Sequence, residues 1–231
     1  MIKDNIVQLR QRIALACAKA GRKPEEITLV AVAKGRSPQE IEEAISAGIT
    51  DIGENRVQEA IAKYNDMRYA ICDMPRNWHM VGHLQTNKVK DAVRIFDLIH
   101  SVDSLRLAEE IGRQAVKADK IQDILLEVKT SPETAKFGMA PEQTAAVVKE
   151  IARLQSIRIL GLMTIAPAVK APEQARPYFR QLRQLLERMN AGRRTQDAGR
   201  ILSMGMTDDF EAAIEEGATM LRIGRAIFEQ G

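Results

Sequence analysis

Aromatic residues are scarce in this chain of 231 residues, where Phe, Tyr and Trp together make up 4%. Its core must therefore be mostly aliphatic, and it has few rings on which the bases of single-stranded nucleic acid could stack. An excess of one charge is also lacking, because 34 Lys and Arg residues face 31 Asp and Glu residues. Without a clustered basic face, we expect no nucleic-acid partner.

Cysteine and long apolar runs are nearly absent as well. Cys17 and Cys72 lie far apart and in no metal-binding or redox spacing, which excludes a disulfide framework and favours a reducing, cytoplasmic location. No run approaches the roughly 18 apolar residues of a membrane-spanning helix, so we expect no membrane contact. The polar start of the chain has no apolar run typical of a signal peptide.

What the chain does have is an alternation of short apolar runs and amphipathic segments. Before Gly21, apolar residues recur three and four apart, which predicts a helix. The run at 27–34 is short, β-branched and nearly all apolar, which is typical of a strand buried on both faces of a parallel sheet. A capping box at 37–40 then begins a helix that we expect to reach residue 47.

The same alternation repeats along the chain. We predict further strands at 51–53, 78–81, 97–102, 121–129, 157–165, 200–204 and 219–223, and helices at 57–67, 87–94, 104–117, 141–154, 173–189, 208–216 and from 226 onward. This count predicts an α/β protein with a single (β/α)8 TIM-type barrel over residues 1–231, preceded by an extra N-terminal helix. An open doubly wound sheet is the alternative, but no glycine-rich fingerprint follows the first strand.

Two polar residues follow the first two strands, at the end of the barrel where catalytic groups gather. Lys34 closes an apolar run, so we expect it to be partly desolvated, which favours the neutral amine that attacks an aldehyde. A lysine that merely extends from a strand end is the ordinary alternative. Asn55 offers a donor and an acceptor within reach of Lys34, or else caps the next helix.

Glycine-containing turns follow the last two predicted strands. Ser203 and Gly205 lie in the first turn, and Gly224 and Arg225 lie in the second. Barrels frequently bind phosphate through backbone N–H groups in these two loops, so the turns together predict a phosphate site. Arg222 lies inside the eighth strand and needs a partner, because unpaired buried charge is costly. That partner could be a ring nitrogen, a carboxylate or a phosphate.

Two histidines, His79 and His83, are four residues apart, a zinc spacing on a helix. Their segment is predicted to be a strand ending at Gly82, and no third ligand is evident. We therefore expect no metal, with His79 packed inside the barrel and His83 at its mouth.

A reactive lysine and a phosphate site fit a class I aldolase as well as a pyridoxal phosphate (PLP) barrel. Longer sequence segments that resemble a known family distinguish the two. From about residue 29 to 228, the chain resembles the pyridoxal phosphate homeostasis protein family, also called the proline synthase co-transcribed homologue family. The segments that carry the resemblance are LVAVAKGRSPQEI, AGITDIGENRVQEAIAKY, WHMVGHLQTNK, KFG, GLMTIAP and LSMGMTDDFEAAIEEGATMLRIGRAIF.

The resemblance implies a fold-type III PLP barrel like the amino-terminal domain of alanine racemase. PLP would form a Schiff base with Lys34, Ser203 and the backbone around Gly224 would hold its phosphate, and Arg222 would face its pyridine nitrogen. The residues that we expect to bind the cofactor are Lys34, Asn55, Ser203, Gly205, Arg222, Gly224 and Arg225.

The chain departs from the family at several positions near the expected site. Ala33 stands where Ser or Thr is usual, Gly35 and Arg36 replace Thr-Lys or Thr-Arg, and Arg56 replaces a common Tyr. Arg225 replaces a Thr whose hydroxyl can help to bind phosphate. Here the backbone N–H or the guanidinium would have to do so, and arginine is a good phosphate neighbour.

The resemblance also bears on catalysis. A racemase needs two bases, and in barrel racemases the second is a tyrosine from a separate carboxyl-terminal domain, which we expect to be absent because the chain ends after the eighth strand. Tyr64, Tyr69 and Tyr178 all lie on predicted helices or their ends. An arginine at the ring nitrogen also weakens PLP as an electron sink.

We therefore expect a non-catalytic cytoplasmic monomer that stores PLP, shields it or hands it to apo-enzymes. The alternatives are a PLP-dependent racemase or lyase with weak activity, and a cofactor-free aldolase that uses Lys34.

Overall fold

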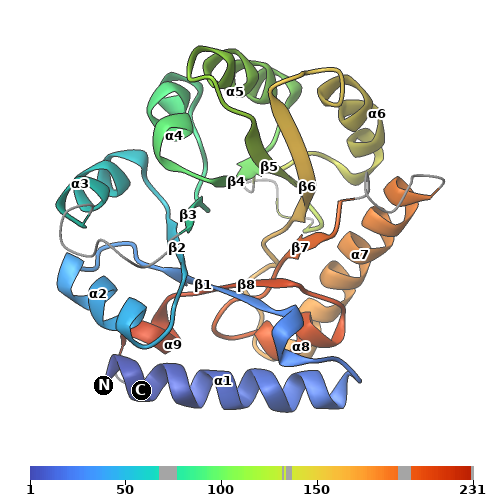
Figure 1. The fold of residues 1–231 in the computed structure, drawn as a ribbon. Coiled ribbons are helices and arrows are strands. Elements are labelled where there is room, and N and C mark those ends of the chain that lie inside the picture. Colours follow the sequence, from blue (N-terminus) through green and yellow to red (C-terminus); the bar gives the residue numbers. More distant parts are fainter. Residues whose placement is uncertain (68–76, 132, 134–136, 192–198, 230–231) are drawn as a thin grey trace.

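The computed structural model describes residues 1–67, 77–131, 133, 137–191 and 199–229. Its parallel strands form a closed barrel in which each strand pairs with its neighbours in sequence and β8 pairs with β1 (Figure 1). The expected (β/α)8 barrel is confirmed, and an open doubly wound sheet is ruled out. The strands are β1 (Thr28–Val32), β2 (Asp51–Glu54), β3 (Asn77–Met80), β4 (Leu98–Val102), β5 (Gln122–Glu127), β6 (Ile157–Met163), β7 (Ile201–Ser203) and β8 (Met220–Ile223).

Helices surround the barrel (Figure 1). They are α1 (Ile2–Lys19), α2 (Pro38–Ser46), α3 (Val57–Met67), α4 (Val89–Ile95), α5 (Leu105–Lys117), α6 (Pro141–Ile151), α7 (Arg176–Asn190), α8 (Phe210–Glu215) and α9 (Arg225–Phe228), with short 3-10 turns η1 (Pro24–Glu26), η2 (Thr86–Lys88) and η3 (Pro172–Ala175). The additional helix, α1, lies along the outside and packs against α2, α8 and α9. Its buried stripe of Ile2, Ile6, Leu9, Ile13 and Cys17 is the one that the spacing predicts.

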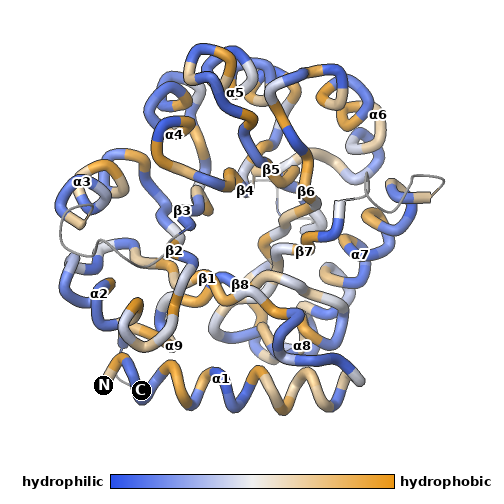
Figure 2. Tube along the Cα trace, viewed as in Figure 1, coloured by the Kyte–Doolittle hydropathy of each residue, from blue (hydrophilic) through white to orange (hydrophobic). Residues whose placement is uncertain are grey.

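The apolar core has two layers. The larger one lies between the sheet and the helices, where Figure 2 shows apolar stretches on the helices and strands. The smaller one fills part of the barrel interior with Val30, Leu98, Leu125, Met163 and Met220. Polar side chains complete the interior, and they belong to the candidate site.

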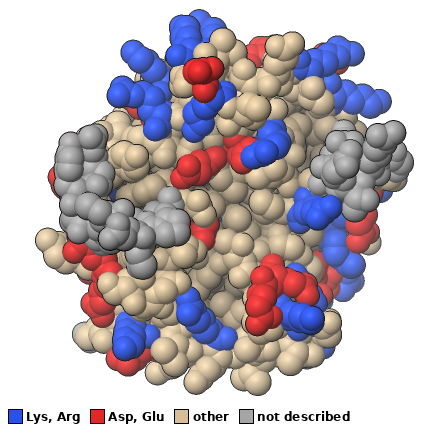
Figure 3. Space-filling model, viewed as in Figure 1, with Lys and Arg blue, Asp and Glu red and all other residues tan. Residues whose placement is uncertain are grey.

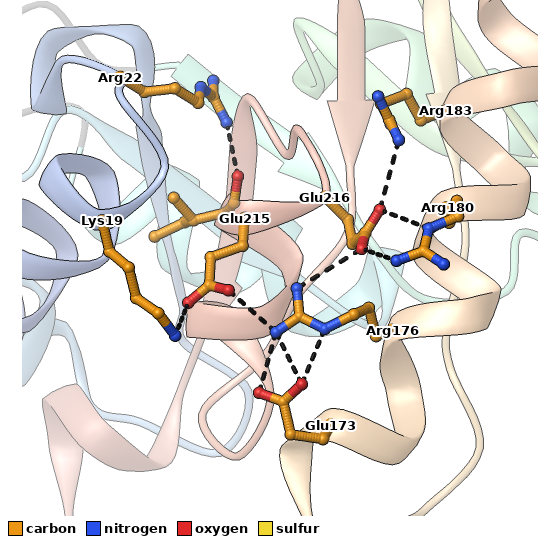
Figure 4. A network of polar contacts seen from close by, with 9 residues as sticks. Lys19, Arg22, Glu173, Arg176, Arg180, Arg183, Glu215 and Glu216 are labelled. Atoms are coloured by element: carbon orange, nitrogen blue, oxygen red, sulfur yellow. Dashed lines mark hydrogen bonds and ion pairs between the residues drawn. The ribbon is translucent and has the colours of Figure 1, made fainter.

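Ion pairs fasten α1 and α7 to α8 (Figure 4). Glu215 of α8 accepts from Lys19 at 2.7 Å and from Arg176 at 2.9 Å. Its neighbour Glu216 is buried and accepts from Arg180 at 2.7 Å. One carboxylate pair thereby joins the N-terminal helix to the helix before β7. Single exposed pairs contribute about 0–1 kcal/mol each, but shared partners in a network contribute more.

The main difference from the predicted element bounds lies at β1, which ends at Val32 and not at residue 34. The chain turns there because Arg36 N donates to Ala33 O at 3.0 Å and Gly35 takes a φ of +68°. Lys34 therefore belongs to a turn. Most of the predicted polar loop at 190–199, together with Tyr69 and Cys72, lies outside the described residues.

Candidate functional site

Backbone contacts bring the turns after several strands together at one end of the barrel. Ala33 N donates to Gly53 O at 2.9 Å, which joins the ends of β1 and β2. A Cβ on Gly224 would lie 3.2 Å from the carbonyl oxygen of Val32, so the turn after β8 lies against the end of β1. Arg222 N donates to Gly205 O at 3.1 Å, which adds the turn after β7. The predicted site residues of β1, β7 and β8 thus share one mouth.

Lys34 is exposed at this mouth and makes no hydrogen bond or ion pair within the described part of the chain. The expectation that it is partly desolvated is therefore wrong for this structure, because the strand ends two residues before it. The free, accessible amine remains suited to attack an aldehyde.

A buried ion pair anchors the backbone immediately before Lys34. The ammonium of Lys63 donates to Glu54 Oε1 at 2.7 Å and to the carbonyl oxygen of Ala33 at 2.6 Å. Burial raises the pKa of Glu54, and Lys63 opposes this rise. Oε2 of Glu54 has no hydrogen-bond partner among the described residues. Sequence reasoning missed this pair, because a lysine nine residues after a glutamate carries no recognisable signal.

Asn55 is partly buried at the end of β2, and its backbone packs tightly on the next turn. A Cβ on Gly82 would lie 2.4 Å from Asn55 O, so only glycine permits this approach. Asn55 and His83 line the same cleft, of about 430 Å³. His83 is exposed and stacks on Phe137 with ring centroids 3.7 Å apart, as expected of a residue at the mouth.

Arg222 is buried inside the barrel, as its place in β8 predicts. Its Nη1 donates to Ser203 Oγ at 2.6 Å, and its Nη2 donates to the carbonyl oxygen of Thr164 at 2.9 Å. Burial lowers the pKa of Arg222 to about 10, opposed by the negative charges of Glu127 and Asp209. The side chain therefore stays cationic at neutral pH, and its guanidinium is held in one orientation by Ser203 of β7 and by Thr164, the residue after β6.

The hydroxyl of Ser203 is fully buried, between Arg222 and His100. It accepts from Arg222 and lies 2.9 Å from His100 Nδ1. A serine hydroxyl has one proton to donate and two lone pairs, so the donor between Ser203 and His100 depends on the tautomer of the histidine. Arg222 and His100 hold the hydroxyl in place, and its hydrogen bond toward a phosphate stays a prediction.

The remaining phosphate candidates are the glycine turns and Arg225. Gly205 has a φ of +95°, and a Cβ there would lie 2.7 Å from that of Ala213. Gly224 is the N-cap of α9, whose first N–H groups have no partner within the helix. Arg225 is exposed, forms an ion pair with Asp208 and lines a cleft beside α1. The side chain of Arg225 thus faces this cleft and a carboxylate. The backbone N–H groups therefore remain as the available hydrogen-bond donors to an anion.

A carboxylate that the sequence analysis missed, Glu127, ends β5 and is 5% exposed. Burial and the negative charge of Asp103 raise the pKa of Glu127 to about 7, while Arg222 opposes this rise. The site thereby holds a group able to give or take a proton near neutral pH. Its only signal in the sequence was an acidic residue at the end of an apolar strand.

The histidines inside the barrel form a second feature that sequence reasoning found only in part. His79 is buried, as expected, and its Nδ1 lies 2.9 Å from Nε2 of His100. His100 was not predicted as a site residue, although it lies on an inward position of β4. The described residues contain no group of three His, Cys, Asp or Glu side chains that could hold a metal ion.

The arrangement fits the three chemical groups of PLP. The free amine of Lys34 suits the aldehyde, and the N–H groups at the start of α9 suit the phosphate. The guanidinium of Arg222 suits an unprotonated ring nitrogen because it only donates hydrogen bonds. Tyr64 and Tyr178 lie on α3 and α7, so no described tyrosine follows a strand as a second base would.

The surface and the helices add two further observations. Figure 3 shows Lys and Arg side chains interspersed with Asp and Glu on the face that it displays. Within the described ranges, no helix is both long and apolar enough to cross a lipid bilayer.

Comparisons with known proteins agree with this geometry. The family model described as alanine racemase, N-terminal domain, matches residues 3–230. The chain is 42% identical over 225 residues to the pyridoxal phosphate homeostasis protein of Aquifex aeolicus, covering 97% of this chain and 96% of that protein. It is 38% identical over 231 residues to the protein of the same name from Escherichia coli K12, covering 98% and 95%.

Solved structures of related proteins have the same barrel fold. PipY of Synechococcus elongatus, solved with PLP bound, is 35% identical with a TM-score of 0.86, covering 99% of this chain and 100% of that one. Alanine racemase of Clostridium difficile shares the fold at 15% identity, with a TM-score of 0.73 and 56% of its chain covered. The chain therefore belongs to the pyridoxal phosphate homeostasis protein family, whose barrel is that of the alanine racemase N-terminal domain.

Proposed function

We propose that this chain binds PLP as a Schiff base on Lys34 and serves PLP homeostasis, as a reservoir that shields the aldehyde and hands it to apo-enzymes. Residues 1–231 would act as one domain, as a monomer in the cytoplasm, with little or no catalysis. The observation that carries the proposal is the exposed side chain of Lys34, two residues after Val32, whose carbonyl oxygen lies against the turn of Gly224. PipY, a full-length relative, has been solved with PLP bound.

The roles of the other residues follow from their positions. Arg222 would donate to the ring nitrogen and keep it unprotonated, and Asn55 would lie beside the cofactor. The backbone at Gly205, Gly224 and Arg225 would bind the phosphate, with the hydroxyl of Ser203 holding Arg222 in place. When bound, PLP would supply an electrophilic aldehyde, and the chain would supply its anchor, its orientation and partial shielding from water.

Absorbance titration with PLP tests this proposal. The wild-type chain should turn yellow and saturate at one PLP per chain, and Lys34→Ala should bind without the visible band. Lys149→Ala is a matched control, because Lys149 is an exposed lysine on α6 and should leave the band unchanged. Incubation of the loaded protein with an apo-PLP enzyme should then restore that enzyme's activity. A wild-type chain that stays colourless in excess PLP would refute the proposal.

A second candidate function is a racemase or lyase of weak activity, and Glu127 is the observation that favours it. A buried carboxyl with a pKa of about 7 could move a proton on an amino acid bound at the site. Arg222 argues against this function, because an unprotonated ring stabilises a carbanion poorly. Exchange of the α-hydrogen of amino acids in heavy water discriminates between the two, and the reservoir predicts none above the rate with free PLP.

A further inference from the structure

A chain of hydrogen bonds crosses the barrel interior from the cofactor end to the opposite end. Ser203 Oγ lies 2.6 Å from Arg222 Nη1 and 2.9 Å from His100 Nδ1. His100 Nε2 lies 2.9 Å from His79 Nδ1, and His79 Nε2 lies 2.9 Å from Asp51 Oδ1. The five residues come from β8, β7, β4, β3 and β2. All are buried, with exposures between 0% and 8%. We call this chain the interior relay.

The two ends of the interior relay fix its direction. Arg222 can only donate hydrogen bonds, and an ionised Asp51 can only accept them. Burial works to raise the pKa of Asp51, but hydrogen bonds from His79, Thr50 and Asn77 outweigh it and hold that pKa below its usual range. Asp51 is therefore ionised at neutral pH.

A neutral His79 that donates to Asp51 leaves the two histidines with one arrangement. Burial, reinforced by the positive charge of Arg222, holds the pKa of His100 well below that of an ordinary histidine, so His100 is neutral. With Ser203 Oγ–H donating to Nδ1, His100 must carry its proton on Nε2 and donate to His79 Nδ1. His79 then carries its proton on Nε2 and donates to Asp51. The hydroxyl of Ser203 and the single N–H of each histidine are then each used once.

The far end of the relay reaches a cleft between α1 and the starts of β1 and β2. This cleft has a volume of about 470 Å³ and is lined by Asp51 together with Arg10 and Glu25. At the cofactor end, the negative charges of Glu127 and Asp209 act on Arg222. Asp51 is also held by Thr50 at 2.6 Å and by Asn77 at 3.1 Å.

We propose that Asp51 and His79, on the side of the barrel opposite the cofactor end, are positioning residues for Arg222. They act on Arg222 through His100 and Ser203. This inference rests on the proposed function, in which Arg222 faces the ring nitrogen of PLP. The charge of Asp51 directs the proton of Ser203 toward His100, which leaves a lone pair of Ser203 for Arg222. The serine thereby holds the guanidinium in its orientation.

A reversed relay would weaken this hold. If His79 donated through Nδ1, His100 would donate through Nδ1 to Ser203, whose two lone pairs would then be taken by His100 and Arg222. The proton of Ser203 would then have no acceptor in the relay, which is costly for a fully buried group. An ionised carboxylate at position 51 prevents this reversal, whereas an amide can either donate or accept.

The test begins with the wild-type chain and needs no substitution. The chain has three histidines, so nitrogen-15 NMR resolves the two ring nitrogens of each, with exposed His83 as an internal reference. The relay predicts that His79 and His100 are both neutral with the proton on Nε2, with or without PLP. A proton on Nδ1 of His100 in the wild-type chain would overturn the proposal.

Asp51→Asn then tests the action at a distance. We expect the Nδ1-protonated form of His100 to reach about a tenth or more of the population, and PLP affinity to fall about 3- to 10-fold, the worth of one hydrogen bond. Asp123→Asn is the matched control, because Asp123 also lies near the start of its strand but pairs with exposed Arg158. It should change neither quantity.

The outcomes separate this inference from the proposed function. Borohydride trapping of PLP on Lys34 reports on the function, whereas the histidine tautomers are measured without PLP. If Asp51→Asn folds and binds PLP like the wild type, with unchanged tautomers, the relay does not position Arg222. If the wild-type tautomers are as expected but Lys34 traps no PLP, the proposed function fails and the relay is structural.

Discussion

The buried ammonium of Lys63 donates a hydrogen bond to the carbonyl oxygen of Ala33, at 2.6 Å, one residue before the free lysine of the site. The same ammonium neutralises Glu54, whose second carboxylate oxygen has no partner among the described residues. A helix residue thus fixes the backbone from which Lys34 extends, while the Lys34 side chain itself is exposed.

Lys63→Met should destabilise the fold by about 3–5 kcal/mol at neutral pH, because Glu54 is left buried and unpaired. Urea unfolding measures this loss. The double variant Lys63→Met/Glu54→Leu should recover most of the stability, since it removes both charges. Equal stability of the single and double variants would show that Glu54 is not the source of the cost.

Glu127→Gln should change how stability depends on pH. The pKa of Glu127 is raised from 4.5 to about 7 in the folded chain, so the folded state binds a proton that the unfolded state has lost. Wild-type stability should therefore fall as the pH rises from about 4.5 to about 7, by about 3 kcal/mol. Unfolding curves of Glu127→Gln should lack this decline, leaving the variant more stable at about pH 8. Parallel pH profiles for the two proteins would contradict this account.

Gly205→Ala should destabilise the turn after β7 in two ways. The φ of +95° is strained for alanine, and the new Cβ would lie 2.7 Å from the Cβ of Ala213. We expect a loss of more than about 1–3 kcal/mol by thermal or urea unfolding. Gly21→Ala is the control for strain alone, because Gly21 has a φ of +65° but open space around it. A smaller loss at Gly205 than at Gly21 would mean that the turn relaxes freely.

The barrel could be predicted from the sequence because the spacing of apolar residues is a local signal. The runs at 27–34 and 157–165 have the composition of buried parallel strands, and β1 and β6 lie within them. The positions of Arg222 and His79 followed from the same signal, since a polar residue inside a buried strand has to face the barrel interior.

The polar contacts inside the barrel could not be predicted in this way. His100 bonds to His79 across neighbouring strands and to Ser203 across the barrel, and these distances depend on register and closure. The exposure of Lys34 was mispredicted for a related reason, because the turn stabilised by Arg36 and Ala33 ends the strand early. Local composition did not reveal that hydrogen bond.

Arg222→Lys should distinguish the role of Arg222 in PLP binding from that of Arg225. Lysine cannot reach Ser203 and the carbonyl oxygen of Thr164 at once, as the Arg222 guanidinium does. PLP affinity should fall about 10- to 100-fold, the worth of a hydrogen bond from a charged group. Arg225→Lys should stay near wild type, because Arg225 is exposed and paired with Asp208. A large effect at Arg225 alone would assign the phosphate to its side chain.

The most direct test of the account is to find where PLP attaches. The protein is saturated with PLP, reduced with borohydride and digested, and the modified peptide is located by mass. We predict a yellow band that bleaches on reduction and a single pyridoxyl group, on Lys34, which is lost in Lys34→Ala. Label on other lysines with none on Lys34, or no label at all, would contradict the central claim.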